Sequence, residues 1–162
     1  DLHTEKLLRL GSGGWVFCPP ANMPEVGELP ALKNGFITFG TFNNLAKCNE
    51  LVMDSWASVL HEVPDSRLMI VAFDSANLRE GLVARGVSES RIIATARSLG
   101  QVYYKMHHSV DIALDTFPFN GLTVSCFAAW MGVPTLSFAE RRPASRVGYE
   151  IAPRLRREMF FR

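Results

Sequence analysis

The hydrophobic residues of the chain alternate between continuous runs and segments with helical spacing. The run Arg67–Phe73 (RLMIVAF) is almost entirely apolar, which is typical of a strand buried on both faces of a sheet. The segment that ends at Pro64 instead repeats its apolar residues at helical spacing. Its predicted buried face consists of Leu51, Val52, Trp56, Val59 and Leu60.

The same alternation of strands and helices continues along the rest of the chain. Further strands are predicted at Gly35–Phe42, Arg91–Thr95, Asp111–Leu114 and Val133–Phe138. Further helices are predicted at Ser75–Arg85, Val102–His108 and Thr123–Met131, the first with Ser75 as its N-cap and Gly86 just beyond its end. This order predicts an α/β fold, a Rossmann-like parallel sheet with helices on both faces.

Glycine and proline mark the expected domain boundaries. They are frequent before Asn34, so residues 1–33 are predicted to be a linker and residues 34–148 the folded domain. Residues 149–162 are predicted to be a truncated or divergent tail. Because the chain begins with Asp1 and ends on MFFR, we expect a fragment of a longer polypeptide.

Composition and charge narrow the classes of function. The 162 residues fit one domain. The formal net charge of +1 does not indicate binding to nucleic acid or to a membrane surface. No apolar run approaches the ~20 residues of a membrane span. Cys18, Cys48 and Cys126 lie far apart without ligand spacing, so we expect no metal site and a reduced, cytoplasmic protein.

Polar residues gather where two predicted strands end. Thr41–Asn44 follows the first strand and Asp115–Thr123 follows the fourth. In open α/β sheets ligands bind beyond the carboxyl ends of the strands. A helix that begins near Thr123 would offer free backbone N–H groups, Ser125 a further hydroxyl, and Lys47 a positive charge. The pattern predicts an anion site, most naturally for a phosphate.

Five blocks of sequence carry a family resemblance. They are FGTFNNLAK (residues 39–47), Trp56 with VPDSRL (63–68), DIALDTFPFNG (111–121), WMGVP (130–134) and ASRVG (144–148). In this order they resemble the C-terminal half of the catalytic region of O-GlcNAc transferases of the SPINDLY type. The resemblance implies the second Rossmann-like domain of a GT-B glycosyltransferase, which binds a nucleotide sugar, usually UDP-GlcNAc. Intact relatives would add a first Rossmann-like domain and a TPR array, and would modify Ser or Thr of acceptor proteins.

The resemblance also implies roles for individual residues. Lys47 would contact the donor diphosphate and stabilise the leaving group without a metal or other cofactor. Asn44 would lie beside the phosphate and sugar, and Tyr103 would occupy the place of a base-stacking histidine. The loop that holds the diphosphate would be Asn120, Gly121, Leu122 and Thr123, with Ser145 and Arg146 opening a helix close to the donor.

Several of these residues also have a purely structural interpretation. Lys47 could be a solvated lysine at a helix start, Asn120 a turn residue, and Ser145 a cap followed by a surface Arg146. Other conspicuous residues are expected to be structural only. Asp115 should organise the following loop, Asp111 is not expected to act as a base, Trp56 and Trp130 should belong to the core, and His107 and His108 should lie at the surface or a helix end.

Two departures from the family pattern leave the function open. Val124 stands where the family has a second threonine, and Phe127 stands where an acidic residue binds the ribose. Loss of a charge-assisted hydrogen bond of that kind costs ~1.5–3 kcal/mol. Both departures favour a non-catalytic remnant that serves as an interaction module. SPINDLY-type relatives also include fucosyltransferases that use GDP-fucose, and the sequence alone does not fix the base or the sugar of the donor.

Overall fold

Five parallel strands form one sheet in the structure, a computed structural model that describes residues 4–6, 8 and 16–151. The strands are β1 (Thr38–Thr41), β2 (Arg67–Ala72), β3 (Ile92–Ala96), β4 (Ile112–Leu114) and β5 (Thr135–Leu136). Their order across the sheet is β3-β2-β1-β4-β5, and every neighbouring pair is parallel. The predicted fold class is confirmed, although most of the strands are shorter than the sequence suggests.

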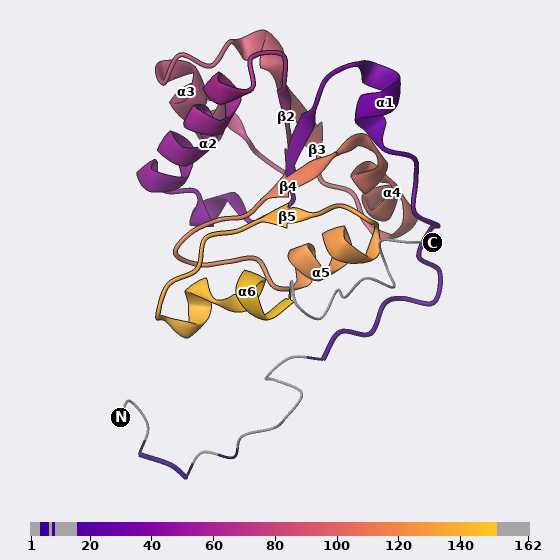
Figure 1. Cartoon of the computed structure of the whole chain (residues 1–162), viewed down its shortest axis with the longest axis vertical. Helices are drawn as coiled ribbons and strands as arrows, with labels where there is room; N and C mark the ends of the chain where they lie inside the picture. The colour runs from indigo at the N-terminus through magenta and orange to yellow at the C-terminus, as the bar shows by residue number, and fades with distance from the viewer. Residues whose placement is uncertain (1–3, 7, 9–15, 152–162) are drawn as a thin grey trace.

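Helices cover both faces of this sheet (Figure 1). The α-helices are α1 (Pro30–Asn34), α2 (Glu50–Glu62), α3 (Ala76–Ala84), α4 (Gly100–Lys105), α5 (Thr123–Trp130) and α6 (Val147–Ile151). Short 3₁₀ helices are η1 (Leu45–Lys47), η2 (Glu89–Arg91), η3 (Met106–Ser109) and η4 (Pro143–Ser145). In the described part of the chain, no helix combines the length and apolar character needed to cross a membrane.

Two hydrophobic cores hold the layers together. One packs α2 and α3 on the sheet through residues such as Trp56, Leu60 and Leu82. The other packs α4 and α5 on the opposite face through residues such as Tyr103 and Ala128. Strand β2 serves both, since Leu68 to Val71 are all buried, as its continuous apolar run predicts.

The face of α2 differs from the predicted one at its beginning. Val52, Trp56 and Leu60 are buried as predicted, but Leu51 is 54% exposed, so its assignment to the buried face is wrong. Trp130 is 39% exposed, which also corrects its assignment to the core. Trp130 is the last residue of α5, and in the described residues its aromatic contact is with Phe17. Helical spacing identifies a common face but not what covers its ends.

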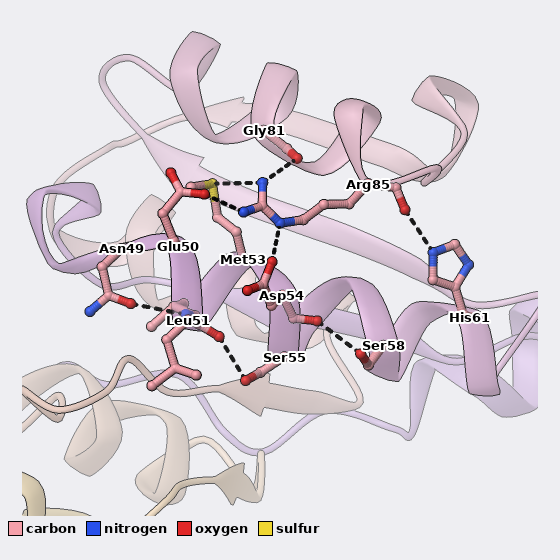
Figure 2. A network of polar contacts seen from close by, with 11 residues as sticks. Asn49, Glu50, Leu51, Met53, Asp54, Ser55, Ser58, His61, Gly81 and Arg85 are labelled. Atoms are coloured by element: carbon pink, nitrogen blue, oxygen red, sulfur yellow. Dashed lines mark hydrogen bonds and ion pairs between the residues drawn. The ribbon is translucent and has the colours of Figure 1, made fainter.

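A polar network ties the outer side of α2 to α3 (Figure 2). Arg85, just after α3, contacts Asp54 through Nε at 2.6 Å and also pairs with Glu50. Its Nη1 donates to the Gly81 carbonyl at 2.8 Å. These acidic partners are largely exposed, so the network does not neutralise a buried charge. It connects the outer surfaces of two crossing helices.

The start of α3 corrects a predicted cap. Ser75 occupies the N-cap position, but its side chain makes no capping hydrogen bond. The carboxylate of Asp74 accepts from the backbone N–H of Ala76 at 2.9 Å instead. The predicted end is confirmed, since Gly86 follows the helix with a φ of 83°.

The predicted linker contacts the domain in its described part from Phe17 onward, and it contains most of a helix, α1, that the sequence did not reveal. The Asp111 carboxylate accepts from the backbone N–H groups of Ala31 and Thr38, both at 2.8 Å, and thereby joins α1 to the sheet. Phe17 lies edge-on to Phe127 of α5, with 5.4 Å between the ring centroids. The predicted tail is described only as far as Ile151, the end of α6; its remainder lies outside the described residues.

Candidate functional site

The candidate site lies between β1 and β4, where the order of the strands in the sheet changes direction. From β1 the chain moves outward to β2 and β3, and it returns to the other side of β1 as β4. Such a switch point leaves a crevice at the carboxyl ends of the two central strands. A pocket of about 500 Å³ opens there. Its lining consists of Asn43, Asn44, Lys47, Arg97, Phe119, Asn120, Gly121, Leu122, Thr123, Val124, Pro143, Ala144 and Val147.

Asp115 builds the loop between β4 and α5. Its Oδ1 accepts from the backbone N–H groups of Thr116 at 2.8 Å and Gly121 at 2.7 Å, and from the amide of Asn43 at 3.2 Å. Its Oδ2 accepts from the Ser137 hydroxyl at 2.5 Å. Burial raises the pKa of Asp115 above its ordinary value, and the four hydrogen bonds oppose that rise. The predicted role of Asp115 in organising the loop is confirmed.

Asn120 is almost completely buried at the turn of this loop. Its Nδ2 donates to the carbonyls of Thr116 at 2.9 Å and Phe138 at 3.3 Å, and its backbone N–H donates to Ala144 at 2.9 Å. The side chain therefore connects the β4–α5 loop to the segment after β5. These contacts give the Asn120 side chain a structural role, and the residue also lines the pocket.

Lys47 ends the short helix η1 and brings a positive charge to the same loop. Its Nζ donates to the Asn120 carbonyl at 3.1 Å and lies 4.3 Å from the ring centroid of Phe119. Burial lowers the pKa of Lys47 below its ordinary value, and the Asp115 carboxylate acts in the opposite direction. The lysine is thus a partly buried cation on the pocket wall rather than a solvated one.

The first turn of α5 faces the same pocket. Leu122, Thr123 and Val124 line it, and Thr123 is exposed. The N–H groups of a first helical turn have no partner within the helix and favour an anion. Ser125 does not add the expected hydroxyl, because it is buried and donates to the Gly121 carbonyl at 3.0 Å.

Gly121 is required by close packing at this loop. A Cβ atom there would lie 2.5 Å from Cγ2 of Val124 and 2.7 Å from Oδ1 of Asn43. Asn44 also lines the pocket, and its Oδ1 accepts from the backbone N–H of Ala46 at 3.0 Å as the cap of η1. The side chain of Asn44 is therefore exposed at the rim but held in one orientation.

Three predicted site residues do not line the pocket. Tyr103 is buried in the core of the α4–α5 face, where it contacts Phe42 and Phe127 with centroid separations of 5.8 and 6.0 Å, and burial raises its pKa to about 12. Ser145 is buried and donates to the Arg142 carbonyl at 3.0 Å. Arg146, the next residue along the chain, is exposed. Around the latter two, Pro143, Ala144 and Val147 line the pocket.

His107 lies at the end of the helical segment formed by α4 and η3, as one of the two expectations had it, but it is a core residue and not a surface one. It is 1% exposed, and its ring stacks on Phe42 at a centroid separation of 3.9 Å. Its Nδ1 lies 3.0 Å from the Tyr104 carbonyl. Burial lowers the pKa of His107 to about 4, so the ring is neutral at pH 7. It supports Phe42, which directly precedes the pocket residue Asn43.

The sequence did not indicate Arg97 as a pocket residue, and it placed Asn43 and Phe119 only within the two segments expected at this edge, with no role of their own. Arg97 directly follows β3, so the strand-end rule that located Asn44 also applies to it. The sequence does not reveal that a residue after an edge strand reaches the central crevice. Among the described residues, no cluster of three His, Cys, Asp or Glu side chains could hold a metal ion.

Comparison with solved structures identifies the sheet and its helices as a GT-B glycosyltransferase domain. A mutant of Thermobaculum terrenum O-GlcNAc transferase superposes with a TM-score of 0.76 and 31% identity, over 83% of this chain and 26% of that one. The glycosyltransferase WaaG, involved in lipopolysaccharide biosynthesis, shares the fold alone, with a TM-score of 0.54 and 13% identity over 88% of this chain and 44% of that one.

Sequence comparison places the chain in a family. The model of glycosyl transferase family 41 matches residues 28–152, and the chain belongs to that family. It is 35% identical, over 92% of its length, to the probable UDP-N-acetylglucosamine–peptide N-acetylglucosaminyltransferase SPINDLY of Hordeum vulgare. The chain spans 16% of the length of that relative.

Proposed function

We propose that this chain is the donor-binding part of a protein O-GlcNAc transferase and that its pocket binds UDP-GlcNAc. The contact between Lys47 Nζ and the Asn120 carbonyl, at 3.1 Å, carries this proposal. It places a partly desolvated cation against the loop that leads into the first turn of α5. A diphosphate between them would meet one full positive charge and the partial charge of a helix N-terminus.

The reaction proposed for the intact protein transfers GlcNAc with inversion. A Ser or Thr hydroxyl of an acceptor protein attacks the anomeric carbon from the face opposite the diphosphate, and UDP leaves. Lys47 and the N–H groups near Thr123 stabilise the negative charge that develops on the leaving group, without a metal ion. The intact protein would supply the acceptor side from a first Rossmann-like domain and a TPR array, so we expect no turnover by this chain alone.

One observation favours a second candidate, a non-catalytic remnant. Phe127 stands where the resemblance places an acidic ribose ligand, and its ring packs against Tyr103 and Phe17 instead. A ligand would then lack one charge-assisted hydrogen bond, which corresponds to a roughly tenfold or larger loss of affinity. Weak or absent nucleotide binding would follow.

Calorimetric titration of the purified chain with UDP tests the proposal. We expect saturable binding that weakens at least about tenfold in Lys47→Ala, because a charge-assisted contact to phosphate is lost. Lys33→Ala, which removes an exposed lysine at the end of α1, should leave the affinity unchanged. A folded chain that binds neither UDP nor GDP would reject the donor site and leave the remnant as the better account.

A further inference from the structure

The charges of the pocket are all of one sign. Of its lining residues only Lys47 and Arg97 carry charge, and both are cations. Lys47 is paired with a carbonyl and with Phe119, as described above. Arg97 has no part in the diphosphate site proposed above. Resting on that proposed function, we propose that Arg97 binds the nucleobase of the donor through acceptor atoms on the edge of the base.

The backbone of Arg97 is fixed by the sheet. Its N–H donates to the Ala72 carbonyl at 3.1 Å and so continues the pairing of β2 with β3 by one residue. Its guanidinium carbon lies 5.6 Å from the ring centroid of Tyr103, within the range of a cation–π contact. The side chain is therefore half-buried and supported by an aromatic ring before any ligand arrives.

The guanidinium lacks a partner of opposite charge. Across the part of the chain that the structure describes, arginine–carboxylate pairs at close distance involve Arg79 and Arg85, on the outer helices, and Arg97 forms none. A guanidinium has five N–H donors and stays charged at any physiological pH. An unpaired, half-buried guanidinium in a pocket is thus available for acceptor atoms of a ligand.

The position of Arg97 in the sheet separates it from the phosphate-binding loop. Arg97 follows β3, which is two strands away from β1 and three from β4. At a spacing of about 4.8 Å between strands, the backbone at the end of β3 is roughly 14 Å from that at the end of β4. The diphosphate is assigned to the β4–α5 loop and Lys47, so a different part of the ligand should face Arg97.

The base is the part whose chemistry matches a guanidinium. Bases present acceptors in the plane of a rigid ring, and the planar fork of arginine pairs with such edges, for example with O6 and N7 of guanine. Uracil offers carbonyl oxygens of the same kind. Tyr103, expected from the resemblance to stack on the base, is instead buried beneath the guanidinium. Arg97 thus takes over contact with the base, and Tyr103 positions Arg97.

Binding of pyrophosphate, UDP and GDP by the full 162-residue chain separates contact with the base from contact with phosphate. We expect Arg97→Ala to weaken both nucleotides about tenfold or more, and to change pyrophosphate affinity by less than about twofold. Arg97→Lys keeps the charge without the fork and should weaken the nucleotides almost as much. Lys47→Ala should weaken all three ligands.

Arg67→Ala is the matched control. Arg67 also lies over an aromatic ring, with 4.1 Å from its guanidinium carbon to the centroid of Phe36, but at the amino end of β2. It should leave all three affinities unchanged, and urea unfolding verifies that each variant is folded.

Three results would count against the proposal in different ways. Equal losses for pyrophosphate and UDP in Arg97→Ala would make Arg97 a phosphate ligand and overturn its assignment to the base. Unchanged UDP and GDP affinities would remove Arg97 from the site altogether. If the folded wild-type chain bound neither nucleotide, the proposed function itself would fail, and this inference with it.

Discussion

At the scale of single residues, Asp115 is the buried group on which the pocket loop most depends. Its carboxylate receives four hydrogen bonds, three of them at Oδ1. Asp115→Ala should lower the free energy of unfolding by about 3 kcal/mol or more, since each buried donor left unpaired costs ~1–3 kcal/mol. Asp115→Asn keeps an oxygen for the three bonds at Oδ1 and should cost about 1 kcal/mol. Urea unfolding measures both, and equal losses in the two variants would contradict this account.

His107 should make stability depend on pH. Its pKa is about 4 in the folded chain, below the ordinary value of 6.5, so between these values the unfolded chain binds a proton that the folded chain does not. The contribution of His107 to stability is therefore present above pH 6.5 and falls by about 3 kcal/mol as the pH is lowered to 4.

The test compares urea unfolding of the wild type and His107→Phe at several values of pH. Phenylalanine preserves an aromatic ring beside Phe42 but cannot titrate. The stability of the wild type relative to the variant should decrease steadily from pH 7 to pH 4. A constant difference over that range would show that folding does not lower the pKa of His107.

At the scale of elements, the close approach of β1 to the chain before β4 depends on Gly40. A Cβ atom at Gly40 would lie 2.5 Å and 2.7 Å from the two methyl carbons of Val110, which is itself buried. Gly40→Ala should therefore destabilise the chain by roughly 1–3 kcal/mol, the usual cost of overpacking.

A double-mutant cycle with Val110→Ala identifies the cause. Val110→Ala removes both clashing methyl groups, so Gly40→Ala should cost clearly less in that background than in the wild type. Equal costs in both backgrounds would mean that the strain arises in the β1 backbone and not from Val110.

The sequence predicts elements more reliably than the contacts between them. The apolar run of β2 predicted a buried strand, and the polar residues after β1 and β4 predicted the edge of the sheet where the pocket lies. Burial at element ends was not predictable, because Leu51 and Trp130 share helical faces with core residues but nothing covers them fully. His107 was misjudged for the opposite reason, since Phe42, 65 positions earlier, provides the ring on which it stacks.

The candidate site shows the same limit. Lys47 and Asn120 were predicted as site residues from their positions after two strands and from the family blocks that contain them. Both line the pocket. Arg97 could not be chosen from the other arginines, because its approach to the pocket depends on the order of the strands in the sheet. Tyr103 matches the family position along the chain, yet its side chain lies within the α4–α5 core.

At the scale of the whole molecule, the pocket joins segments that are far apart in the chain. Four segments contribute to its lining, which consists of Asn43, Asn44 and Lys47, then Arg97, then residues 119–124, and finally Pro143, Ala144 and Val147. A ligand that contacts all four must leave before any of them can separate from the others. Binding should therefore stabilise the fold as a whole, by about 2.7 kcal/mol at a UDP concentration of 100 times Kd.

Urea unfolding with and without UDP measures this linkage, and hydrogen exchange locates it. Exchange should slow at residues 119–124 and 143–147. The gain in stability should be smaller in Lys47→Ala at the same concentration of UDP, because a larger Kd lowers the ratio of UDP concentration to Kd. Slower exchange confined to residues 119–124 would mean that the ligand contacts only the β4–α5 loop. The segment around η4 would then have no part in binding, and the ligand would contact only some of the residues that line the pocket.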